Sequence, residues 1–244
     1  MDMRDVLNTM LSLHRSGCQW EMLPHDVLPK STVYDYFAQW RDDGTWAGVV
    51  KAWRERHRVE AGREPTPSAA CIDRPSVKTT ARGGPERGSE GGKKLNGRKR
   101  PLLVDTRGLL LAIVLTSAGW DDGVAALTVR GHVHPQAFPR LVTIVAAQQS
   151  HHPDLEAWRA EPRAGWRIDV QTRPAGTQGF TPREKRGVLE RTNAWPGRYR
   201  RNSQADERSL ESRTAMIQRS NIHRMLNRLA PCDRPAFHDR QEAA

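Results

Sequence analysis

The chain has 244 residues, of which 37% are hydrophobic and 27% are charged, a size that allows one large domain or two small ones. Lys and Arg number 39 against 28 Asp and Glu, and the resulting net charge of +11 favours a polyanionic partner. The longest apolar run, Leu109–Leu115, has seven residues, which excludes a membrane span of roughly 20 residues, and the N-terminus has no signal-peptide core. Three scattered cysteines exclude a disulfide scaffold and a CxxC metal site and are typical of a reducing cytoplasm.

Residues 1–62 are predicted to form three helices joined by short turns. A 3.6-residue apolar stripe begins at Val6, Gly17 is a plausible stop, and Ser31 is the expected N-cap of the second helix. The third helix follows a turn at 42–44 and ends in a basic stretch that holds Arg54, Arg56 and Arg58. This pattern predicts a helix-turn-helix-like DNA-binding region. The alternative is a small bundle whose aromatic residues are all core.

Composition changes after residue 62. Residues 63–68 are predicted to be a linker, and residues 69–73 a short buried strand that ends in Asp73. Residues 74–100 hold nine Lys or Arg against two Glu, with six Gly. Because this segment has almost no apolar side chain, it is predicted to be a mobile, cationic loop.

The rest of the chain alternates between strand and helix patterns. Residues 102–105 and 109–115 are predicted to form a β-hairpin in which Asp105 stabilises the turn. The further elements are strands at 141–146 and 166–170, weak helices at 124–127 and 154–159, a basic helix at 183–201 interrupted by Pro196-Gly197, an amphipathic helix at 210–229, and a disordered tail at 231–244. Antiparallel strands followed by parallel α/β units predict a mixed α/β sheet flanked by helices.

Two carboxylates stand out beside the cationic segment. Asp73 ends the first strand, and Glu190 lies on the late basic helix, so this topology can bring them to one sheet edge. Carboxylates hold hard divalent cations, and neighbouring bases hold phosphates. A two-metal clamp on a phosphodiester needs a third carboxylate as well.

From about Arg4 to Leu229 the chain resembles DDE-type transposases of bacterial insertion sequences, which have a ribonuclease-H-like core. The residues that carry the resemblance are RDVLN (4–8), SGCQWEMLP (16–24), STVYDYFAQWRDDGTW (31–46), AACIDRPSVKTT (69–80), GGKKLNGRKR (91–100), LLVDTRGLLLAIVL (102–115) and VLERTNAWPGRYRR (188–201). The resemblance implies a helical N-terminal module at 1–62 and a catalytic core at 69–230.

The resemblance also implies a reaction and a metal. Two Mg²⁺ or Mn²⁺ ions would activate water to cut DNA at the element's end, and the freed 3′-hydroxyl would attack target DNA. Asp73 would bridge the metals and Glu190 would bind one of them. The implied setting is the bacterial cytoplasm and its nucleoid, with double-stranded DNA as partner and with paired ends held by a homo-oligomer.

Basic residues of two segments are the candidates for contact with the DNA backbone. Trp195 lies among them and is either a core residue or a base-stacking platform. The candidates are Lys78, Lys93, Lys94, Arg98, Lys99, Arg100, Arg191, Arg198, Tyr199, Arg200 and Arg201.

The chain departs from the family pattern at the second catalytic Asp. That residue normally ends the fourth strand, and the matching position here is Ala147, followed by Gln-Gln-Ser where the family has a Gly-Gly-Tyr-like turn. A methyl group cannot ligate a metal, although Asp154 or Glu156 nearby is an alternative ligand, and Asp122 is a weaker candidate for a place near the site.

Other departures point to a degenerate copy. Asn193 and Pro196 replace apolar residues of the family pattern, Pro101 stands where a His is usual, and the chain starts within the usual N-terminal helical region. The hypotheses are therefore an impaired transposase, a non-catalytic DNA-binding remnant or dominant-negative partner of an active relative, and a relic without function. The histidine pairs at 132/134 and 151/152 suggest zinc, but no cysteine or carboxylate lies at ligand spacing around the first pair, so a zinc site is not favoured.

Overall fold

The computed structural model describes residues 1–80, 84–121, 124, 128–129, 131–147, 166–171 and 186–231. Three helices and a short 3₁₀ turn open the chain, namely α1 (Met3–Ser16), η1 (Trp20–Met22), α2 (Lys30–Asp42) and α3 (Thr45–Glu60). Gly17 ends α1 in the left-handed conformation, as predicted, and the turn at 42–44 separates α2 from α3. The predicted cap of α2 is wrong, because the N-cap is Pro29, two residues before Ser31, and the helix begins at Lys30.

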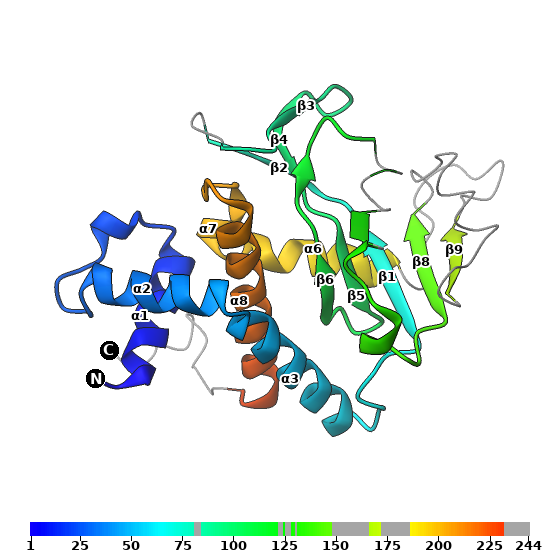
Figure 1. Ribbon diagram of the computed structural model, residues 1–244, viewed down its shortest axis with the longest axis horizontal. Helices are drawn as coiled ribbons and strands as arrows, with labels where there is room; N and C mark the ends of the chain where they lie inside the picture. The colour runs from blue at the N-terminus through cyan, green and yellow to red at the C-terminus, as the bar shows by residue number, and fades with distance from the viewer. Residues whose placement is uncertain are drawn as a thin grey trace, which may run out of the picture.

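A five-stranded mixed sheet forms the centre of the rest of the molecule (Figure 1). Its strands are β1 (Ala69–Asp73), β5 (Leu102–Asp105), β6 (Leu110–Ile113), β8 (Thr143–Ala147) and β9 (Arg167–Gln171), in the spatial order β6-β5-β1-β8-β9. β5 pairs antiparallel with β1 and β6, whereas β8 pairs parallel with β1 and β9. This confirms the predicted hairpin and the mixed sheet, whose order is that of a ribonuclease-H-like core.

Three strands lie between residues 74 and 100, so the prediction of a mobile loop is wrong for the described part of this segment. A second, small sheet contains β2 (Ser76–Lys78), β3 (Gly88–Glu90), β4 (Leu95–Lys99) and β7 (Thr116–Ser117). Backbone pairing replaces the missing apolar core: β4 pairs with all three other strands. Gly97 permits this approach, since a Cβ at that position would lie 2.0 Å from the carbonyl oxygen of Val77.

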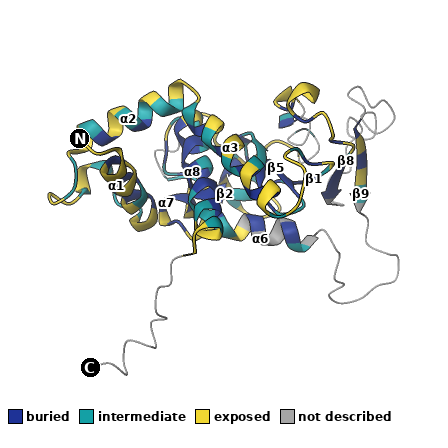
Figure 2. Cartoon of the chain, turned by 90° about the horizontal axis from the view of Figure 1, so that it is seen from below, coloured by how far each residue is buried: buried dark blue, intermediate teal, exposed yellow. Residues whose placement is uncertain are grey.

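The C-terminal region is helical. It contains α6 (Arg186–Gly197), α7 (Arg200–Ser203) and α8 (Leu210–Leu229), and a 3₁₀ turn, η2 (Pro135–Ala137), precedes β8. The predicted bounds of α8 are confirmed, and the side chain of Ser209 caps it by accepting a hydrogen bond from the Ser212 amide at 3.1 Å. α8 runs between the N-terminal helices and the large sheet and is buried along much of its length (Figures 1 and 2).

Alternating side chains of the large sheet face two apolar cores. Cys71, Leu102, Val104 and Val145 pack with the helices on one face. On the other face, Ala70, Ile72, Leu103, Ile144 and Ile168 pack with residues that include Val129, Phe138 and Trp166. This period of two is the signature of a sheet covered on both faces.

The N-terminal helices share the first of these cores with the rest of the chain. Val6, Met10, Phe37 and Trp46 belong to the same cluster as Ile217 of α8 and the sheet residues named above. The two predicted domains therefore meet across a continuous apolar core. Within the described residues no helix is long and apolar enough to cross a membrane.

The basic end of α3 points inward. Arg54 donates a hydrogen bond to the carbonyl oxygen of Leu110 at 3.0 Å, and Arg58 contacts Asp105. The prediction that this stretch faces DNA is therefore wrong for Arg54 and Arg58, whereas Arg56 is exposed. The predicted helix at 154–159, residues 125–127 of the other weak helix, and residues 232–244 of the tail lie outside the described residues.

Candidate active site

Asp73 and Ala147 end adjacent parallel strands. The register pairs Cys71 with Val145 and Ile72 with Ala146, so the next row joins positions 73 and 147. Cys71 and Val145 belong to the core on the helical face, and positions two residues further along each strand fall on that same face. The sheet thus brings position 147 beside Asp73 at the carboxyl end of β1.

Asp73 lies among cationic groups. Its Oδ1 accepts a hydrogen bond from the Arg74 amide at 2.9 Å. Arg100 directly follows β4, its guanidinium is buried, and its Nε and Nη1 have no hydrogen-bond partner among the residues that the structure describes. Burial lowers the pKa of Arg100 to about 10, and the Asp73 carboxylate opposes that shift. The carboxylate therefore has a fixed positive charge as its neighbour.

Glu190 lies on α6, which packs against β1. The Val188 side chain of the same helix belongs to the shared core. The helix thus passes the strand that carries Asp73. The side chains of Glu190 and Arg191 lie outside the described part of the chain, as do Asp122, Asp154 and Glu156. Asp105 is described fully, and its predicted role is confirmed: its Oδ1 accepts hydrogen bonds from the amides of Arg107 and Leu109, each at 2.9 Å.

The described residues do not fit a two-metal site. Among them, no group of three or more His, Cys, Asp or Glu side chains is placed to hold a metal ion. Position 147 offers no oxygen, and the charge beside Asp73 is a guanidinium, which repels a cation. Within the described residues this edge therefore presents Asp73 without the set of three ligands that a metal site needs.

Comparison with known protein families agrees with this topology. A family model described as "Transposase DDE domain" matches residues 64–222, and one described as "Putative transposase of IS4/5 family" matches residues 1–50. The chain belongs to the DDE transposase family. No curated protein matches it in sequence. Family membership places the chain among insertion-sequence transposases, enzymes that act on DNA.

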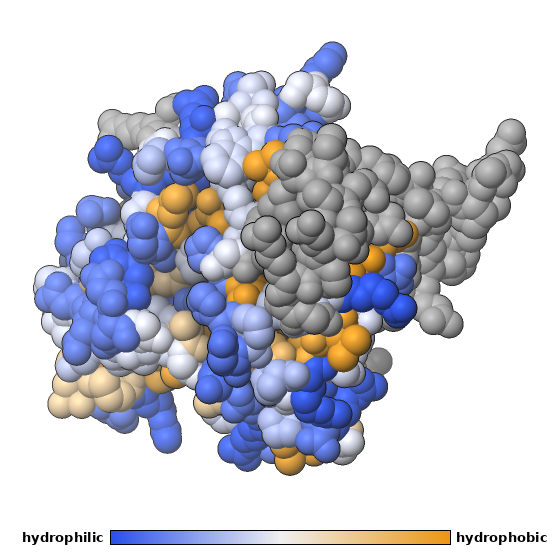
Figure 3. Space-filling view, turned by 45° about the vertical axis from the view of Figure 1, so that its right-hand side comes forward, coloured by the Kyte–Doolittle hydropathy of each residue, from blue (hydrophilic) through white to orange (hydrophobic). Residues whose placement is uncertain are grey.

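The cationic candidates of this transposase chain divide into exposed and buried groups. Lys78, Lys93, Lys94, Arg198 and Arg200 are exposed, and Lys93 pairs with Glu90 at 2.8 Å. Hydrophilic side chains cover much of the face shown in Figure 3, between smaller apolar patches. The exposed candidates remain available to a phosphate backbone.

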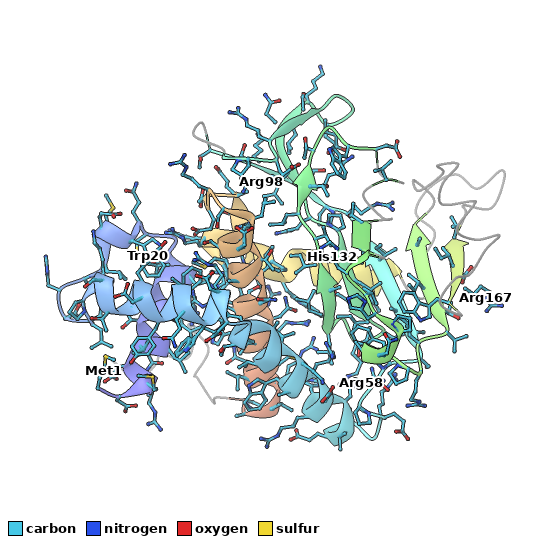
Figure 4. All side chains as sticks on the ribbon, in the orientation of Figure 1. Met1, Trp20, Arg58, Arg98, His132 and Arg167 are labelled. Carbon is cyan, nitrogen blue, oxygen red and sulfur yellow. The ribbon has the colours of Figure 1, made fainter. Side chains whose placement is uncertain are left out.

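The other candidates are engaged inside the protein, which corrects the expectation that they face DNA. Arg98 is 1% exposed and donates to the carbonyl oxygens of Pro85, Glu207 and Arg208, thereby fastening the small sheet to the start of α8 (Figure 4). Lys99 is buried against the carbonyl oxygen of Trp120, as Arg100 is buried beside Asp73. Nothing in the sequence indicates this burial, because the strand is short and has few apolar residues.

Two residues of the second basic segment are likewise buried. Arg201 donates to a carboxylate oxygen of Glu207 at 2.7 Å and also to the carbonyl oxygen of Cys18. The Tyr199 hydroxyl hydrogen-bonds Nδ1 of His223 at 2.7 Å, and burial raises the pKa of Tyr199. Both residues therefore tie α7 to its neighbours.

Trp195 contacts arginines that the sequence did not single out. The guanidinium carbons of Arg224 and Arg228 lie 3.7 and 4.7 Å from the centroid of its ring. Their spacing of four residues could have indicated a shared contact, because it places Arg224 and Arg228 on one face of α8.

Proposed function

We propose that this chain is a DNA-binding insertion-sequence transposase whose metal-dependent strand cleavage is impaired by Ala147. The observation that carries the proposal is the strand register. Ile72 pairs with Ala146, so the next residues, Asp73 and Ala147, stand side by side. In the family pattern both of these positions hold a carboxylate. A clamp on a phosphodiester needs oxygen ligands from both strands. Alanine supplies none.

The surroundings of Asp73 support the same proposal. In a working site, a divalent metal would supply the charge that stabilises the reacting phosphodiester. Here the buried guanidinium of Arg100, which directly follows β4, interacts electrostatically with the carboxylate. Metal binding at Asp73 would have to overcome this repulsion and the missing ligand together.

Double-stranded DNA is the proposed partner, and the element's terminal repeats are the proposed binding sites. The net charge of +11 and the exposed basic side chains, chiefly Lys78, Lys94, Arg198 and Arg200, support backbone contact. These contacts do not need the carboxylates. Binding is therefore proposed to persist where cleavage is lost.

The test compares plasmid nicking by the unmodified chain and by Ala147→Asp, with Mg²⁺ or Mn²⁺ and DNA that carries the element's ends. We expect no nicking by the unmodified chain and metal-dependent nicking by Ala147→Asp. The double variant Ala147→Asp/Glu190→Ala is the matched control and should be silent, because it keeps the new carboxylate and removes another.

Each result has a distinct meaning. Nicking by the unmodified chain, lost on Glu190→Ala, would show that another carboxylate replaces position 147 and would overturn the impairment. Failure of the unmodified chain to bind duplex DNA in the same buffer would overturn the binding function. Silence of Ala147→Asp would mean that the loss at position 147 is not what limits cleavage.

A further inference from the structure

A cationic pocket lies at the junction of α1, α6 and α8. Its volume is about 600 Å³, and its wall includes Arg15 of α1, Arg224 and Arg228 of α8, and Arg198 just after α6. Among the described residues, no Asp or Glu lines it. Four guanidinium groups around one hollow repel one another, so the pocket is built for an anion.

The arginines of α8 are held in place before any ligand arrives. Trp195 packs against both, with Arg224 at 3.7 Å and Arg228 at 4.7 Å from the ring centroid. Arg224 also donates through Nη2 to the carbonyl oxygen of Gly108 and, at 3.3 Å, to Asn221. Such preorganisation removes part of the entropy cost of binding.

Arg224 retains an unsatisfied donor. Its Nη1 is buried and has no hydrogen-bond partner within the described part of the chain. Burial, and then the positive charge of Arg228, lowers the pKa of Arg224 to about 9. The Asp105 carboxylate opposes this shift only in part, and a buried cation that is incompletely paired is costly. A bound anion would relieve both the missing hydrogen bond and the repulsion.

The pocket is remote from the carboxylate edge. Asp73 pairs with Leu102 at the start of β5, whereas Ala70 pairs with Asp105 at its end. Gly108, which accepts from Arg224, belongs to the turn after that end. The pocket therefore adjoins the opposite end of the sheet from Asp73.

We propose that this pocket binds a backbone phosphate of duplex DNA, at a distance from the phosphodiester at the carboxylate edge. The inference rests on the proposed DNA-binding function and adds a contact site to it. Guanidinium groups fit phosphate oxygens with paired hydrogen bonds. The Trp195 ring is covered by guanidinium groups, which favours a phosphate over a stacked base as the ligand.

The test uses the full chain and the double variant Arg15→Gln/Arg228→Gln. Both side chains are exposed, so the substitutions leave the buried Arg224 in place. Duplex affinity is measured by fluorescence anisotropy across a salt series, and circular dichroism checks the fold. The matched control, Arg4→Gln/Arg56→Gln, removes the same charge from exposed positions on α1 and α3.

We expect the pocket variant to bind duplex DNA about 60-fold more weakly at ~0.1 M salt, with a log–log salt slope shallower by about 1.8, because each phosphate contact contributes about 0.9 to that slope. The control should change affinity several-fold less and keep the slope. Equal slopes in the pocket and control variants would overturn the proposal.

A second arm separates DNA from free phosphate. Inorganic phosphate is added to the unmodified chain and to the pocket variant, and the melting temperature is measured. If phosphate stabilises only the unmodified chain while duplex binding is the same in both, the pocket takes a free anion and the DNA assignment is wrong. Because neither arm needs cleavage, both are independent of the outcome at Ala147.

Discussion

Arg58 of α3 and Asp105 of the β5–β6 turn form a buried ion pair, with Nη1 2.5 Å from Oδ2 and the Asp105 side chain 0% exposed. The same carboxylate accepts two backbone amides of its turn through Oδ1. Arg58 also donates through Nε to the carbonyl oxygen of Glu64 at 2.8 Å. One carboxylate thus joins the N-terminal helices to the central sheet.

Removing Arg58 should therefore destabilise the whole molecule. Arg58→Met leaves a buried carboxylate without its cation, and we expect a loss of about 3–5 kcal/mol in the free energy of unfolding, measured with urea. Arg56→Met is the control, since Arg56 forms an exposed pair with Glu60 that is worth about 0–1 kcal/mol. Equal losses in both variants would contradict the structural role of the buried pair.

His14 should make the fold sensitive to mild acid. Its ring is fully buried against Tyr199, with centroids 4.7 Å apart. Burial, followed by the charge of Arg219, holds its pKa well below the ordinary 6.5. Above that pH the ring is neutral in both states. Below it, the unfolded chain takes up a proton that the folded chain refuses, so stability falls by about 1.4 kcal/mol per pH unit until the lowered pKa is reached.

The check is urea unfolding at about pH 7.5 and about pH 5.5, on either side of the ordinary histidine pKa. His14→Phe keeps an aromatic ring and should lose less stability between the two pH values than the unmodified chain. His57, whose pKa burial also lowers, is present in both proteins. The exposed His25→Gln is the control, and a loss in His14→Phe as large as in this control would argue against the assignment.

Two glycines with the same backbone conformation should respond differently to alanine. Gly44 and Gly108 have φ values of +79° and +74°. A Cβ at Gly44 meets nothing within 4 Å, whereas one at Gly108 lies 2.4 Å from Thr192 Oγ1 and 2.8 Å from the Trp195 ring.

Gly44→Ala should cost about 1–2 kcal/mol, the penalty of the left-handed conformation alone. Gly108→Ala should cost more, because it must also displace α6, and chemical denaturation measures both. The two variants differ only in crowding, so indistinguishable unfolding energies would show that the turn does not pack against α6 in this way.

Metal binding at the carboxylate edge can be tested without DNA. We expect Mn²⁺ to leave the melting temperature of the unmodified chain unchanged and to raise that of Ala147→Asp, because a ligand that binds the folded state stabilises it. Ala147→Asn serves as the control for polarity without charge. A Mn²⁺-dependent shift of the same size in the unmodified chain would contradict the view that Ala147 disables the site.

Much of the fold was predictable because its elements carry strong local signals. The stripe of α8 and the hairpin around Gly108 form where their patterns indicate, and the apolar strand predicted at 141–146 forms at 143–147. Asp73 at a strand end was also readable from sequence. The small sheet was missed, since β2, β3 and β4 are short and rich in Gly and Lys or Arg, a composition typical of loops.

The sequence by itself determined the main helices, the strands of the large sheet and the family, and it is the source of the proposal that a carboxylate is missing at position 147. These depend on local periodicity and on residue identity at fixed places along the chain. Only the tertiary structure decided which arginines are internal. Arg58 and Arg98 are chemically the same as the exposed Arg198, and each is buried because carbonyl or carboxylate oxygens far away in sequence meet it. Burial of a cation depends on partners that folding brings together, and no local pattern encodes them.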